Sequence, residues 1–160
     1  MFEIIMYLFE NYIQAQILPA PEADELVDEL ELAGFKKTEI QKAFAWFAGL
    51  NKTHEGNIWF KKQAHQNIRF YIPEEKRKLG RRCLGLLAYL EQIGIITPEL
   101  RETIIDRAMA IENSRIEFEE LKWIVLMVLF HNLDKSQDIK SDLTWIENLL
   151  FTDLETQTVH

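Results

Sequence analysis

The strongest constraint on the fold is a segment, residues 117–131, whose apolar side chains would cover most sides of a helix. These side chains are Phe118, Leu121, Trp123, Ile124, Val125, Met127, Val128, Leu129 and Phe130. A helix that is apolar all round needs neighbours on every side, so the segment predicts the central helix of a core. Its unbroken apolar run, 123–130, is far shorter than the roughly 20 residues of a membrane span. We therefore expect no membrane association.

Six further segments repeat apolar residues with the period of a helix and are bounded by capping or stop residues. They predict helices at 2–17, 22–33, 36–50, 74–93, 98–112 and 142–152. Thr97 followed by Pro98 is typical of a helix start, with the cap preceding a proline at the first helical position. Residues 51–56 have the composition of a turn. The predicted fold class is mainly α, with about seven helices.

One region departs from the helical period. Residues 58–60 and 68–72 are rich in β-branched and aromatic side chains, and a polar run separates them. This pattern predicts at most one short hairpin within 57–72. Three helices followed by a hairpin is the order of a winged helix-turn-helix. We predict a winged-helix-like unit at 1–72 and a helical bundle at 73–160 that share one core.

Positive charge is concentrated in one stretch of an otherwise acidic chain. The whole chain has net charge −8, with 18 Lys and Arg against 26 Asp and Glu. Residues 61–82 hold eight of these basic residues, opposed only by Glu74 and Glu75, so the stretch is +6 and the remainder −14. A two-signed surface steers partners, so the stretch is our candidate contact surface. Its candidate contact residues are Lys61, Lys62, Arg69, Arg77, Lys78, Arg81 and Arg82.

Four of these residues, Arg77, Lys78, Arg81 and Arg82, have the spacing i, i+1, i+4 and i+5. On a continuous helix they share one outward face, opposite Leu79, Cys83 and Leu86. Two interpretations are equally supported. The face could bind phosphate or an acidic protein surface, or it could be a solvated face paired with acidic helices of the same chain.

The leading functional hypothesis is a non-enzymatic, cytoplasmic adaptor whose partner is another protein. The alternative is a winged-helix protein that binds nucleic acid through Lys36, Lys37 and Lys42 of a recognition helix and through the basic stretch. Glu39 lies among those lysines, and the chain lacks the basic balance of nucleic-acid-binding domains. These features favour the protein partner.

No catalytic residue, cofactor or metal site is predicted. The four histidines are scattered, and none has the spacing of a metal site with another histidine or with Cys83. Cys83 lies on an apolar helix face, which favours a buried, inert thiol over a nucleophile. A single cysteine excludes an internal disulfide and fits a reducing compartment, so we expect a cytoplasmic protein.

The segments taken in order resemble the Smg family of bacterial proteins. The matching stretches are MFEIIMYLFENYI, LELAGFKKTEI, IRFYIPEE, CLGLLAYLEQIGIIT, LRETIIDRAMAIEN, FEELKWIVLMVLFHN and IENLLF. They cover nearly the whole chain except 51–66 and 133–143, and FEELKWIVLMVLF is the most specific piece. The resemblance implies no activity and no catalytic residues.

Overall fold

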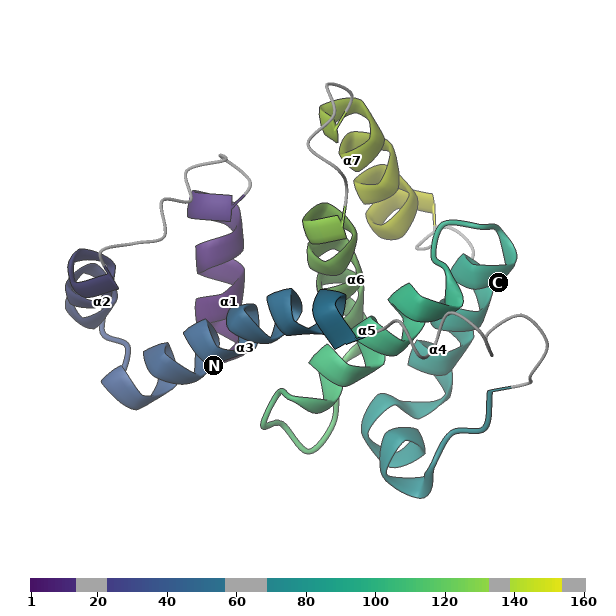
Figure 1. Cartoon of the computed structure of the whole chain (residues 1–160), viewed down its shortest axis with the longest axis horizontal. Helices are drawn as coiled ribbons and strands as arrows, with labels where there is room; N and C mark the ends of the chain where they lie inside the picture. Colours follow the sequence, from purple (N-terminus) through teal and green to yellow (C-terminus); the bar gives the residue numbers. More distant parts are fainter. Residues whose placement is uncertain (14–22, 57–68, 133–138, 154–160) are drawn as a thin grey trace.

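A computed structural model describes residues 1–13, 23–56, 69–132 and 139–153, which form helices and connecting segments without a strand (Figure 1). In chain order the elements are α1 (Phe2–Leu8), the π-helical turn η1 (Phe9–Ile13), α2 (Ala23–Leu32), α3 (Lys37–Gly56), α4 (Pro73–Gln92), α5 (Pro98–Met109), α6 (Phe118–Asn132), α7 (Ile139–Asn148) and the π-helical turn η3 (Leu149–Asp153). The prediction of a mainly α fold with about seven helices is confirmed.

Helix α6 lies at the centre of the core. Eight of its fifteen residues are buried, and α4, α5 and α7 all pack against it. From the N-terminal side, the ring of Phe9 makes edge contacts with Trp123 and Phe130, at centroid separations of 6.4 and 5.6 Å. The helix predicted from its all-round apolar composition is therefore the central one.

The N-terminal helices join the rest of the molecule where α3 crosses α5. The indole Nε1 of Trp46 donates to the carbonyl of Arg107 at 2.8 Å, and Arg107 Nη1 donates to the carbonyl of Trp46 at 2.9 Å. Gly49 leaves room for the guanidinium of Arg107, because a Cβ at position 49 would lie 1.8 Å from Arg107 Nη1. Buried side chains from all seven helices belong to one apolar cluster. A division near residue 72 stays a prediction.

Helix α3 corrects one expectation. Residues 51–56 were predicted as a turn, but the helix continues through them to Gly56. Adding a residue to an existing helix costs much less than nucleating one, so weak helix formers such as Asn51 and Thr53 can extend α3.

The predicted hairpin lies largely outside the described residues, because these omit 57–68. Residues 69–72, which were predicted as part of its second strand, do not form a strand in the structure. The likeness of α1, α2 and α3 to a winged helix stays a prediction.

Candidate functional site

The candidate site is built around a kink in α4 at Gly80. This residue has φ 69° and ψ 172°, which interrupts the helix between Leu79 and Arg81. Glycine populates positive φ without the steric cost that a Cβ brings. At the break, the carbonyl of Lys78 accepts a hydrogen bond from the backbone N–H of Ile116 at 2.8 Å. The kink thus holds the loop between α5 and α6 against α4.

Lys78 points into this junction rather than outward. Its Nζ donates to the carbonyl of Met109 at 2.8 Å and also to the carbonyl of Ile111. The last carbonyls of a helix have no partner within it, and the ammonium group of Lys78 satisfies that of Met109 at the end of α5. Burial lowers the pKa of its ammonium group. Lys78 therefore does not share the outward face predicted for it, because the carbonyls of Met109 and Ile111 hold its ammonium group.

Cys83 lies on the inner side of the kink. Its thiol is buried and donates to the carbonyl of Ile116, at an Sγ–O distance of 3.7 Å. Burial raises the pKa of the thiol to about 11. Because the reactive form is the thiolate, this environment makes Cys83 a poor nucleophile at neutral pH.

Five exposed cationic residues either flank Gly80 in the chain or lie against it, and we call them the basic corner: Lys76, Arg77, Arg81, Arg82 and Arg115. The Arg82 guanidinium stacks over the ring of Phe118, 4.3 Å from its centroid. Arg115 lies against the kink, with Nη2 3.4 Å from where a Cβ of Gly80 would be. The side chains of Lys76, Arg77 and Arg81 form no hydrogen bond or ion pair with the described part of the chain.

Arg115 is the cation of the corner that sequence analysis missed. It follows a run of turn residues in the loop before α6, more than 30 positions from Gly80. No local pattern in the sequence connects the two positions. Tertiary hydrogen bonds bring the loop, and Arg115 with it, to α4: Ile116 bonds to both Lys78 and Cys83.

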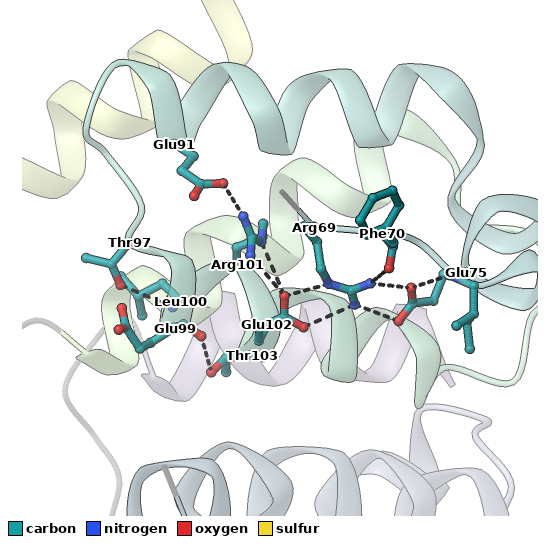
Figure 2. A network of polar contacts seen from close by, with 11 residues as sticks. Arg69, Phe70, Glu75, Glu91, Thr97, Glu99, Leu100, Arg101, Glu102 and Thr103 are labelled. Carbon is teal, nitrogen blue, oxygen red and sulfur yellow. Dashed lines mark hydrogen bonds and ion pairs between the residues drawn. The ribbon is translucent and has the colours of Figure 1, made fainter. Parts of the chain in front are cut away.

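Arg69 belongs to a network inside the molecule (Figure 2). Its guanidinium makes two bonds to the Glu75 carboxylate, at 3.0 and 2.8 Å, and two to Glu102, at 2.7 and 3.1 Å. These hydrogen bonds raise the pKa of Arg69 and lower that of Glu75. Glu75 also accepts from the backbone N–H of Ile72 at 3.2 Å, at the start of α4.

The network continues along α5. Arg101 binds Glu102 at 3.2 Å and Glu91, near the end of α4, at 2.6 Å. The two arginines and three glutamates thus tie residues 69–72, both ends of α4, and α5 together, as Figure 2 shows. We call Arg69, Glu75, Glu91, Arg101 and Glu102 the arginine network. The structure gives Arg69 a role in holding the fold.

The residues predicted for nucleic-acid recognition have mixed surroundings. Lys36 and Lys37 are exposed at the start of α3. Lys42 Nζ forms an ion pair with Glu112 at 2.7 Å, and Glu39 pairs with the α-amino group of Met1 at 2.7 Å. Lys61 and Lys62 lie outside the described residues. The structure therefore does not unite the ten candidate residues in one surface.

Two apolar side chains next to the basic corner are also exposed. Phe70 and Ile72, just before α4, are 83% and 53% exposed. Sequence analysis assigned both to a strand and gave them no contact role. Their alternation in IRFYI is the signal that could have placed them on one side of an extended segment.

Two features are absent from the described ranges. Those residues contain no group of three or more His, Cys, Asp or Glu side chains that could hold a metal ion. Among the helices described, none combines the length and the apolar character that crossing a membrane requires.

Comparisons with known proteins point to one family. The family model described as "Protein of unknown function (DUF494)" matches residues 1–160. A Smg homologue from Vibrio campbellii is 41% identical over 155 residues, covering 95% of this chain and 95% of its own. Smg homologues from Aeromonas salmonicida and Photobacterium profundum are 41% and 43% identical over 133 residues, 82% of this chain and 85% of each relative. No solved structure matches.

Proposed function

We propose that this chain, which belongs to the Smg family (DUF494), is a non-enzymatic bacterial adaptor that acts in the cytoplasm. No activity is assigned to the family, so the proposal rests on the surface of the protein. The adaptor binds an acidic surface of another protein through the basic corner. The observation that carries the proposal is the exposure of five cations around one kink, in a chain whose net charge is −8.

The way the corner is held favours binding. Arg82 rests on Phe118, and Arg115 rests on the backbone at Gly80. Side chains that are already ordered lose less conformational entropy when a partner binds. Lys76, Arg77 and Arg81 have no carboxylate partner in the described residues, so their charge is available to a partner. Exposed Glu74 reduces the local charge by one unit.

Apolar contact area accompanies the charge. Phe70 and Ile72 are exposed within a few residues of Lys76 and Arg77. Protein interfaces derive much of their affinity from a few aromatic and arginine side chains, while charge complementarity sets orientation and association rate. A surface that offers both kinds of residue fits a protein partner.

Nucleic acid is the second candidate. The exposed Lys36 and Lys37 at the start of α3 support it. The ion pairs of Lys42 and Glu39 oppose it, because they occupy the same turns of the proposed recognition helix. The acidic balance of the chain also opposes nonspecific binding to phosphate.

The proposal includes no reaction. The absence of a reaction from the proposal is supported by the thiol of Cys83, which is buried and has a pKa raised to about 11. A catalytic cysteine needs the opposite environment, one that is accessible and lowers the pKa.

The test is affinity capture from native cells with the wild-type chain and with Arg77→Glu/Arg81→Glu. Lys36→Glu/Lys37→Glu is the matched control, because it changes net charge equally at another exposed pair. We expect one partner to be lost with the first variant and retained with the control, and to bind again when both purified proteins are mixed. Recovery of the same partners by all three chains would overturn the proposal.

Binding of duplex and single-stranded DNA and RNA is measured in parallel at several salt concentrations. A phosphate-binding mode gives a linear fall of log K with log salt. Such a fall, abolished by Arg77→Glu/Arg81→Glu, would replace the protein partner with nucleic acid.

A further inference from the structure

The molecule has a second charged surface at the end opposite the basic corner. Figure 1 places α2 at the far left and α4 on the right, with α1 and α3 between α2 and the rest of the chain. Helix α2 contains five carboxylates and no lysine or arginine. Within one molecule, α1 and α3 therefore separate the two charged ends.

One side of α2 combines acidic and apolar groups. Leu30 is buried against the core, whereas Asp24, Glu25, Asp28 and Leu32 are all exposed. Their spacing of i, i+1, i+4 and i+8 places them on one side of the helix. Leu32 is 90% exposed at the end of this row. We call these four residues the acidic face.

The acidic face and the basic corner are complementary in two respects. Three carboxylates stand against five cations, and an exposed leucine stands against exposed Phe70 and Ile72. Contact between two acidic faces, or between two basic corners, would bring like charges together, which is unfavourable. Complementarity therefore favours contact between unlike ends.

We propose that the acidic face of one copy docks on the basic corner of a second copy. This inference rests on the proposed function, because it uses the same corner to bind protein. The contact is head-to-tail and leaves one acidic face and one basic corner free in every assembly that does not close into a ring. Self-association and binding of an outside acidic partner therefore compete for the corner.

The test is sedimentation equilibrium of the purified full chain. At low salt we expect the average mass to rise with protein concentration beyond that of a dimer, because head-to-tail contacts leave open ends. At about 1 M salt, where the Debye length is about 3 Å, we expect a monomer. A monomer at every concentration and salt, or a dimer that grows no further, would overturn the proposal.

A charge-swap pair tests the contact itself. Variant one carries Arg77→Glu/Arg81→Glu, and variant two carries Asp24→Lys/Asp28→Lys. Each variant alone keeps one end intact and leaves the other with a net charge of about +1, so we expect its self-association to weaken at least about tenfold. In an equimolar mixture the intact acidic face of variant one meets the intact basic corner of variant two, so we expect a one-to-one complex that grows no further. Association by either variant alone at the wild-type level, or a monomeric mixture of two folded variants, would contradict the proposal.

The two proposals fail separately. Loss of self-association with retained capture of an outside partner leaves the proposed function in place and removes the second copy. Self-association of the pure chain, combined with unchanged partners in cells for Arg77→Glu/Arg81→Glu, would instead remove the adaptor function. Circular dichroism of each variant verifies that these exposed substitutions leave the helices intact.

Discussion

The arginine network and the basic corner come from the same part of the chain but treat positive charge in opposite ways. Arg69 is surrounded by carboxylates and is only 21% exposed, whereas Arg77 and Arg81 face solvent without a partner in the described chain. In sequence, all three contribute equally to a stretch of charge +6. In the structure, the first holds α4 to α5, and only the others are available to a partner.

The difference teaches that the availability of a charge depends on the neighbouring helix. Glu102 of α5 lies 33 residues from Arg69 and accepts two of its bonds. Lys78, whose Nζ is held by carbonyls at the end of α5, belongs with Arg69 in this respect. Substitutions in the network should therefore change stability, and substitutions in the corner should change binding.

The largest expected effect comes from Arg69→Ala. It leaves the Glu75 carboxylate, only 12% exposed, with no cationic partner and leaves Glu102 with Arg101 alone. Breaking a partly buried ion pair in this way should lower the free energy of unfolding by about 2–4 kcal/mol. Urea unfolding monitored by circular dichroism measures the change, at unaltered m-value.

The matched control is Arg77→Ala, eight residues along the chain from Arg69 and near the start of α4. An exposed substitution without a partner changes the free energy of unfolding by about 0.5 kcal/mol or less. Equal losses in the two variants would remove the distinction between network and corner.

The next effect concerns the kink that displays the corner. Gly80→Ala places a Cβ on a residue with φ 69° and should cost about 1–2 kcal/mol of unfolding free energy. Gly85→Ala lies in the same helix, with open space around the new methyl group, and should stabilise by about 0.5–1 kcal/mol. Thermal unfolding of both variants reports the signs. Two changes of the same sign would argue against a kink maintained by glycine.

Acidic pH should distinguish the network further. The pKa of Glu75 is lowered by its bonds to Arg69. A carboxylate with a lowered pKa in the folded state stabilises the fold above its unfolded pKa, and this contribution is lost as pH falls through the folded pKa. Between about pH 5 and pH 3, wild-type stability should therefore fall more steeply than that of Arg69→Ala. Urea unfolding of both proteins across this pH range measures the difference. An equally steep fall in the two proteins would show that Arg69 does not set the pKa of Glu75.

The sequence predicts the helices well because their signals are local. Periodicity located all seven, and the cap at Thr97 is confirmed by its Oγ1, which accepts from Leu100 N at 3.2 Å. The surroundings of each cation were not predictable, because Arg69 and Lys78 bond to residues of α5 that lie 33 and 31 positions further along the chain. Gly80 was a local signal that the prediction did not use: a glycine inside a helical pattern can mark a break, whereas 74–93 was predicted as one continuous helix.

The smallest effect tests whether the cations of the corner repel one another. Arg81→Gln removes one of five neighbouring positive charges and should stabilise the fold by a few tenths of a kcal/mol at low salt, since like charges in proximity are unfavourable. At about 1 M salt, with a Debye length of about 3 Å, the gain should vanish.

Arg101→Gln should behave differently, because Arg101 is only 14% exposed and its pairs with Glu91 and Glu102 are less screened. Its loss of stability should persist at both salt concentrations. A salt-independent gain in Arg81→Gln would mean that the five cations do not act as one electrostatic surface, and the corner would then lose the feature that makes it a docking site.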